Sequence, residues 1–148
     1  MSDNRKLIIH EAIIGAVKKL LTERVNEILL DEDFEVPIIE FGNYQDGRSV
    51  SPVIALLSCE KTEKERIIRL DAYSLMITFS LPETIKTESQ CYAYSSAVCT
   101  AIKEDPTMGG VVDRAVVIGE KYVPPKTRNC GQCWEVVLTL RVTVEGMA

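Results

Sequence analysis

The chain is poor in the residues and runs that mark several specialised classes of protein. Its 148 residues include one His, one Trp and three Phe. No apolar run approaches the roughly 18 residues of a membrane-spanning helix, and Glu11 interrupts the first apolar stretch too early for a secretory signal. The eight glycines form neither G-x-G-x-x-G nor G-x-x-x-x-G-K. The sequence therefore predicts neither a membrane span nor a phosphate-binding glycine loop.

The charge balance is acidic and the composition is that of a soluble globular protein. Against 22 Asp and Glu there are 17 Lys and Arg, a formal net charge of −5. Because broad phosphate binding requires clustered cations, this balance argues against a protein that grips nucleic acid over a large surface. The length predicts a single domain over residues 1–148, with residues 1–6 and 146–148 flexible. The five cysteines lack a disulfide-framework spacing, which fits a reduced, intracellular chain.

Two segments have the periodicity of amphipathic helices. Residues 7–30 carry apolar side chains at helical spacing, and 24 residues at 1.5 Å each predict a helix about 36 Å long. Residues 87–104 form the second predicted helix. Thr87 and Gln90 match a capping box at its start, with Thr87 as the N-cap.

Five further segments have the alternation or the short apolar runs of β-strands: residues 36–41, 52–59, 67–81, 111–123 and 134–145. Residues 52–59 are nearly all apolar, which predicts a central strand covered on both faces. The element order is α–β–β–β–α–β–β. Strands joined directly favour an α+β fold, a single domain with a mostly antiparallel or mixed sheet of about five strands flanked by two helices.

Two charged segments are candidate partner surfaces. Between the second and third strands lie alternating charges, at Glu60, Lys61, Thr62, Glu63, Lys64, Glu65 and Arg66. They are typical of a solvated hairpin tip, but the long strand that follows also suits a protruding arm that contacts a neighbouring subunit. The first helix is followed by Asp31, Glu32, Asp33 and Glu35. This acidic segment is either a solvated loop or an acidic surface that serves a partner or repels DNA.

The sequence presents no constellation of catalytic residues. Cys130 and Cys133 form a C-x-x-C pair, but the pair precedes a strand rather than a helix N-terminus that would lower the thiol pKa. A zinc ion would need two further ligands. His10 is the lone histidine, and no nucleophile motif accompanies it, so we expect a packed imidazole. We expect no enzyme activity, no cofactor and no metal, with Cys130 and Cys133 as the weaker candidates for a metal or redox site.

The layout of the whole chain is more informative than any single motif. A long N-terminal helix is followed by F-G-N-Y at 41–44, a charged hairpin at 59–66 and a long strand that includes 71–79. A second helix and the closing strand 134–146 complete the order. Over residues 7–146 this layout resembles the tail-terminator, or minor tail-completion, family of long-tailed bacteriophages.

The resemblance implies an α+β subunit of a ring, commonly a hexamer, that caps the tail tube and joins the tail to the head. The implied partners are other copies of the chain, the tail tube protein and head connector proteins, with DNA passing through without specific binding and with no membrane. The implied location is the virion tail, and the host cytoplasm during assembly, for a phage or a prophage. A different neck or connector component of the same fold type is an alternative, as is a thiol- or zinc-dependent enzyme built on Cys130 and Cys133.

Overall fold

The protein combines a helical layer with a long antiparallel sheet. The computed structural model describes residues 2–42, 49–63, 68–82, 86–125 and 133–147, with side chains from 9 to 145 within these ranges. The elements are α1 (Ser2–Leu20), the π-helical turn η1 (Leu21–Val25), α2 (Asn26–Asp31), β1 (Ile38–Ile39), β2 (Ser49–Val50), β3 (Val53–Glu63), β4 (Ile68–Pro82), α3 (Thr87–Glu104), β5 (Arg114–Val123) and β6 (Cys133–Met147). The α+β class is therefore as predicted, and no helix of the described residues is long and apolar enough to cross a membrane.

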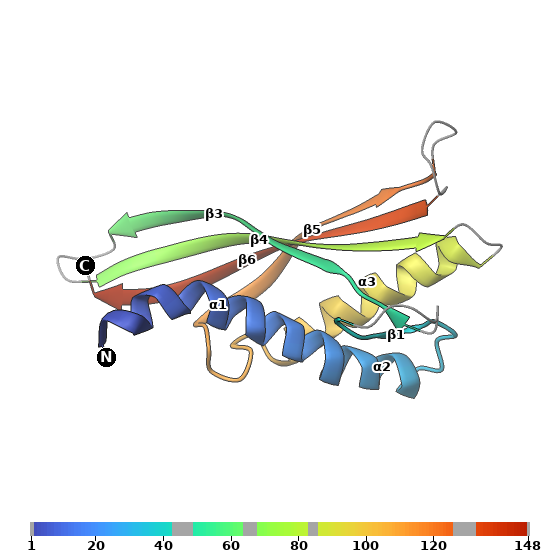
Figure 1. Ribbon diagram of the computed structural model, residues 1–148, viewed down its shortest axis with the longest axis horizontal. Coiled ribbons are helices and arrows are strands. Elements are labelled where there is room, and N and C mark those ends of the chain that lie inside the picture. The colour runs from blue at the N-terminus through green and yellow to red at the C-terminus, as the bar shows by residue number, and fades with distance from the viewer. Residues whose placement is uncertain (1, 43–48, 64–67, 83–85, 126–132, 148) are drawn as a thin grey trace.

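The main sheet has four strands in the order β3-β4-β6-β5, with every neighbouring pair antiparallel. Its centre is the pair β4 and β6, which stay in register from Ile68↔Met147 to Pro82↔Cys133. Figure 1 shows the strands as a long twisted layer, with α1, α2 and α3 packed along one side of it. The side chains of alternate residues on β4 and β6 point to that side and are buried, at Tyr73, Leu75, Ile77, Phe79, Leu81, Val136, Leu138, Leu140 and Val142.

The helices complete this core with their own apolar stripes. Ile13, Val17 and Leu21 of the first helical stretch are buried, as are Ala97, Val98 and Ala101 of α3. Small residues on α3 let its backbone approach the sheet, and the Tyr94 ring stacks on Phe79 with ring centroids 4.8 Å apart. Burying a side chain of this size contributes about 1.5–3 kcal/mol.

The first helix begins earlier and is less regular than the sequence predicts. It starts at Ser2 and continues to Asp31, but the turn Leu21–Val25 is π-helical. Within that wider turn the Thr22 hydroxyl donates to the Lys18 carbonyl (3.0 Å) and the Asn26 amide donates to the Thr22 carbonyl (2.9 Å). Side-chain hydrogen bonds to helix carbonyls compete with the regular α-helical pattern. Periodicity alone does not reveal that competition.

The predicted strand 36–41 does not join the main sheet. Only Ile38–Ile39 is extended, as β1, and it forms a small parallel sheet with β2. The Asn26 side chain accepts a hydrogen bond from the Ile39 amide and donates to the Ile39 carbonyl, both at 2.8 Å. These two bonds use the backbone amide and carbonyl through which Ile39 could pair with a further strand besides β2. The five-stranded sheet of the prediction is therefore wrong, and four strands plus a separate pair replace it.

Two further local predictions are wrong. The apolar run 52–59 is not a central strand, because β3 lies at the sheet edge and Val53 and Leu57 are exposed. Thr87 is not the N-cap of α3: Lys86 is, and the Thr87 hydroxyl donates to the Pro82 carbonyl at 2.8 Å. In both cases a contact that the local pattern does not reveal decided the outcome. The helical layer covers only one face of β3, and the Pro82 carbonyl takes the hydroxyl that a capping box would use.

Replacing Tyr94 with Phe tests how much the buried hydroxyl of α3 contributes. The hydroxyl donates to the Pro37 carbonyl across the helical layer, and its loss leaves that carbonyl without this partner. We expect Tyr94→Phe to lower the free energy of unfolding by about 1–3 kcal/mol, measured by urea denaturation. Tyr92→Phe is the matched control, because Tyr92 is exposed and bonds to Glu88 at the surface. An equal loss in both variants would contradict the role of the Tyr94–Pro37 bond.

Candidate interaction surfaces

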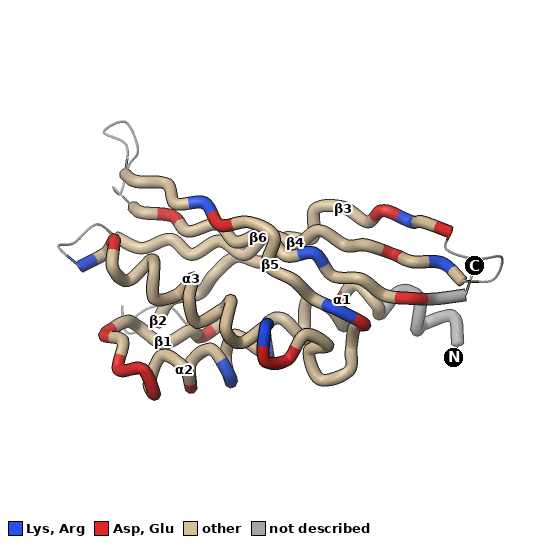
Figure 2. The backbone as a smooth tube through the Cα atoms, turned by 180° about the vertical axis from the view of Figure 1, so that it is seen from behind, with Lys and Arg blue, Asp and Glu red and all other residues tan. Residues whose placement is uncertain are grey.

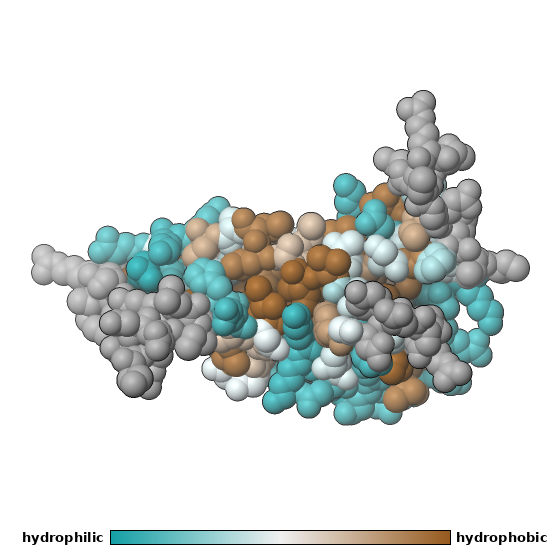
Figure 3. Space-filling view, in the orientation of Figure 1, coloured by the Kyte–Doolittle hydropathy of each residue, from teal (hydrophilic) through white to brown (hydrophobic). Residues whose placement is uncertain are grey.

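The face of the sheet opposite the helices is not covered by any helix or strand of the described residues (Figure 1). Exposed apolar side chains occur on the two outer strands: Val53 and Leu57 on β3 are 65% and 56% exposed, and Ile118 on β5 is 57% exposed. Figure 3 shows hydrophobic residues gathered at mid-length over β3 and between this strand and α1. Contiguous exposed apolar surface is typical of an interaction site.

The charged hairpin is placed only in part. Glu60, Lys61, Thr62 and Glu63 end β3 and are exposed, whereas Lys64, Glu65 and Arg66 lie outside the described residues. The described part is not an isolated two-stranded arm, since β6 runs beside β4 as far as Met147. Next to it, Arg69 bridges the buried Asp71 at 2.8 Å. The base of the hairpin is thus a three-stranded extension of the sheet with an exposed, mixed-charge outer strand.

The acidic segment follows α2 at the surface, at the opposite end of the helical layer from the N-terminus (Figures 1 and 2). Asp31, Glu32, Asp33 and Glu35 are all exposed. Asp33 has a positive φ of 55°, which turns the chain out of the helix. A hydrogen bond from Lys86 to Glu35 (2.9 Å) lowers the pKa of the Glu35 carboxyl from its ordinary value. The structure thus places four carboxylates on one exposed turn.

The cysteines are not brought together in the described part of the chain. Cys133 opens β6 opposite Pro82 and is half-buried, and Cys130 lies outside the described residues. No group of three His, Cys, Asp or Glu able to hold a metal occurs among the described side chains. Cys91 is buried in α3, where burial, with a smaller contribution from Glu88, raises its thiol pKa to about 11. Thiols with a raised pKa are poor nucleophiles at neutral pH.

His10 contacts an aromatic residue of the sheet. Its ring lies edge-on against Tyr73 with the ring centroids 5.3 Å apart. Burial, together with the neighbouring Cys59, raises the pKa of the Tyr73 hydroxyl to about 12. Tyr73 is therefore neutral at physiological pH, and the contact is an aromatic one at the edge of the core.

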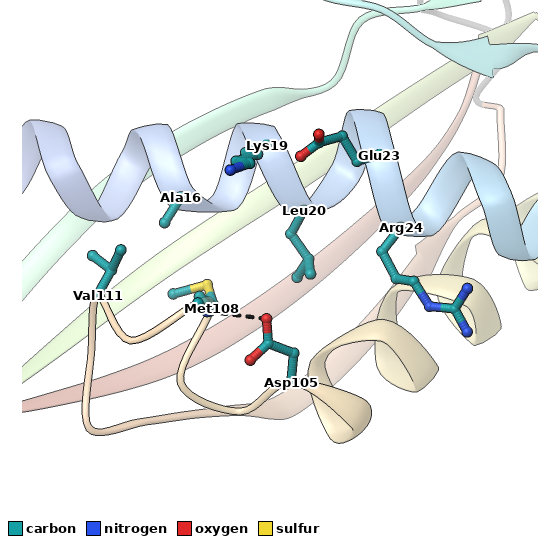
Figure 4. Close-up of a pocket in the computed structure, with 9 residues that line it drawn as sticks. Ala16, Lys19, Leu20, Glu23, Arg24, Asp105, Met108 and Val111 are labelled. Carbon is teal, nitrogen blue, oxygen red and sulfur yellow. Dashed lines mark hydrogen bonds between the residues drawn. The ribbon is translucent and has the colours of Figure 1, made fainter.

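A hollow of about 280 Å³ lies between the first helical stretch and the loop after α3 (Figure 4). Two of its charged groups, Arg24 and Asp105, bond within the protein. The Arg24 guanidinium donates to Glu104 (2.9 Å) and to Glu27, and Asp105 accepts hydrogen bonds from the Gly109 amide (3.0 Å) and Thr107 hydroxyl (3.3 Å). The Arg24–Glu104 pair joins the first helical stretch to the end of α3, and the Asp105 bonds order the loop, which gives the hollow a structural role.

A second groove, of about 540 Å³, lies between the C-terminal half of α3 and β5. Its lining is apolar except for the cations Lys103 and Arg114 and the thiol of Cys99. Of the side chains that the structure describes, no carboxylate lines this groove. The groove thus combines an apolar lining with two positive charges, and it lies beside the outer strand β5.

Sequence reasoning missed a polar cluster beside this groove. The hydroxyls of Ser95 and Tyr122 both donate to the Glu120 carboxylate, and the Tyr122 ring packs against Tyr92 with centroids 5.1 Å apart. The cluster joins α3 to β5. Its signal in the sequence is Glu120, a charged residue at a position of β5 that faces the helical layer, since its strand partner Leu138 is buried.

The accessibility of the Cys91 thiol can be tested by alkylation. We expect iodoacetamide to modify Cys91 at pH 8 at least roughly a hundredfold more slowly in the folded protein than in urea, because the raised pKa reduces the thiolate and burial blocks access. The rate should rise as the pH approaches 11, where the thiolate forms. Peptide mass spectrometry of quenched samples measures it, and equal rates in folded and unfolded protein would contradict the burial of this thiol.

Comparison of the sequence with models of protein families, and with curated proteins, finds no match.

Proposed function

We propose that the chain is a structural subunit of a phage or prophage tail, one that assembles with further copies of itself into a ring at the end of the tail tube. The observation that carries the self-assembly is the uncovered sheet face with its apolar outer strands. Val53 and Leu57 on β3 and Ile118 on β5 are more than half exposed, and Val116 on β5 is exposed as well. A monomer gains nothing from such a surface, whereas a repeating assembly buries it.

The tail itself is proposed from the order of elements along residues 7–146, which resembles the tail-terminator family. The described elements are compatible with that layout: a long N-terminal helix, an antiparallel sheet and a second helix before the closing strands. In this function the ring stops growth of the tail tube and joins the tail to the head, with DNA passing through its lumen. Other neck or connector components of the same fold type are the nearest alternative.

A thiol- or zinc-dependent enzyme is the alternative from a different class. It requires Cys130 and Cys133 to act together with further ligands or with a helix N-terminus. Cys133 begins a strand, and its neighbour across the sheet is Pro82. This placement favours the structural role over thiol chemistry.

Self-association of the purified chain is the first test of the proposed function. We expect a homo-oligomer larger than a dimer in multi-angle light scattering at micromolar concentrations, and a ring in negative-stain electron microscopy, because the exposed apolar side chains of the two outer strands favour repeated association. Immunogold labelling of virions should place the chain at the head-proximal end of the tail. A strict monomer across the whole soluble concentration range would overturn the ring.

A further inference from the structure

We infer that copies of this chain join through their sheet edges, with the outer edge of β3 from one copy added to β5 of the next. The inference rests on the proposed ring, and it names the two surfaces that meet and the side chains that set their register. The occupant of each edge is a second copy of this chain.

Both edges of the main sheet are available for pairing. Within the described residues, β3 pairs only with β4, and β5 pairs only with β6. Most of the outer edge of β5 has no backbone partner among the described residues, although the Pro106 carbonyl accepts a hydrogen bond from the Ala115 amide at 2.7 Å. An added strand would therefore pair with β5 beyond this point, from Val117 to Val123.

The direction of the strands favours a head-to-tail contact. Four strands alternate in direction, so β3 and β5 run opposite ways at the two edges. If a second copy is placed beside the first in the same orientation, its β3 runs antiparallel to β5. The sheet then continues with the same alternation, and all the helices stay on one side. A contact between two different edges repeats from copy to copy and closes into a ring when the rotation permits.

The charges at the two edges match in this arrangement. Glu60 pairs with Ala72, Ala72 with Thr143 and Thr143 with Arg114, so these four residues form one row across the sheet. Glu60 and Arg114 end the row at opposite edges, and both lie on the face away from the helices. In a continued sheet the row brings Glu60 of one copy to the level of Arg114 of the next, just beyond the end of the paired segment Val117–Val123. Opposite charges on neighbouring strand ends favour this register over others.

The groove between α3 and β5 extends this complementarity. It contains Lys103 and Arg114 and no carboxylate, whereas the end of β3 presents Glu60 and Glu63 with one base, Lys61. Apolar side chains of the two edges also come close together in this arrangement. Leu57 and Ile118 are each the extra residue at an irregularity of an edge strand, and both are exposed. In the unstaggered arrangement they lie at neighbouring levels, about one or two residue rises of ~3.3 Å apart.

A charge-swap experiment tests this contact on the full chain. We expect Glu60→Arg and Arg114→Glu each to weaken self-association at least about tenfold, because each places like charges at the ends of one row. The double variant E60R/R114E should restore assembly, since it re-creates an opposite pair. Sedimentation velocity over a concentration series measures the association.

Matched controls separate this contact from a general effect of charge. Glu23→Arg and Lys19→Glu make the same two charge reversals at exposed residues of the helical layer, beside the hollow of Figure 4, and should assemble as the wild type does. Thermal midpoints and circular dichroism establish that each variant is folded. If a reversal unfolds the chain, the neutral variants E60Q and R114Q should show a smaller loss in the same direction.

The outcomes distinguish this inference from the proposed function. Assembly that is unchanged in E60R and R114E, or that is lost in both and not restored in the double variant, overturns the edge contact and leaves the ring in place. A wild-type chain that stops at a dimer indicates a symmetric contact between like edges and overturns both. A wild-type chain that remains monomeric at every concentration overturns the proposed ring itself.

Discussion

The pairing of β4 with β6 is the constraint on which the rest of the structure depends. Fifteen consecutive residue pairs hold these strands in one register, and a shift by one residue would turn every apolar side chain of the core toward solvent. Because only one face of the pair is apolar throughout, the helices can pack on one side alone. The other face, and the outer strands β3 and β5, are then left to the surface. The interaction surfaces of the protein follow from this one-sided core.

Much of the main sheet could be predicted because the alternation of apolar and polar side chains shows which face of a strand is buried. The regular alternation in 134–145 corresponds to β6, and the long stretch 67–81 corresponds to β4 with a one-residue difference at each end. The predictions that failed concerned positions decided by a particular partner rather than by local pattern. The Ile39 backbone bonds to the Asn26 side chain, and the Thr87 hydroxyl bonds to the Pro82 carbonyl. The apolar strand β3 lies at an edge of the sheet rather than at its centre. Neither apolar content nor local propensity encodes which neighbour a strand will have.

The candidate surfaces divide in the same way, into features that a sequence pattern indicates and features that only the fold creates. Charge alternation made residues 60–66 a candidate partner surface, and the structure exposes the described part of this segment at the end of an outer strand. The groove between α3 and β5 could not be predicted, because its members come from residues 99–117 and become neighbours only when α3 packs on β5. Likewise, Glu60 and Arg114 are unrelated in the sequence. Their common row exists only through the three strand pairings that connect them.

The hydrogen bonds from Asn26 to Ile39 have a consequence for the behaviour of the protein at high concentration. A short extended segment such as β1 presents backbone donors and acceptors that another molecule could use as a template for aggregation. The Asn26 side chain makes the hydrogen bonds that a neighbouring strand would make, so the amide and the carbonyl of Ile39 are both bonded at that edge. The small sheet is thereby closed to intermolecular growth on this side. At the edges of the main sheet, by contrast, charged side chains such as Glu60 and Arg114 can govern which molecule is admitted.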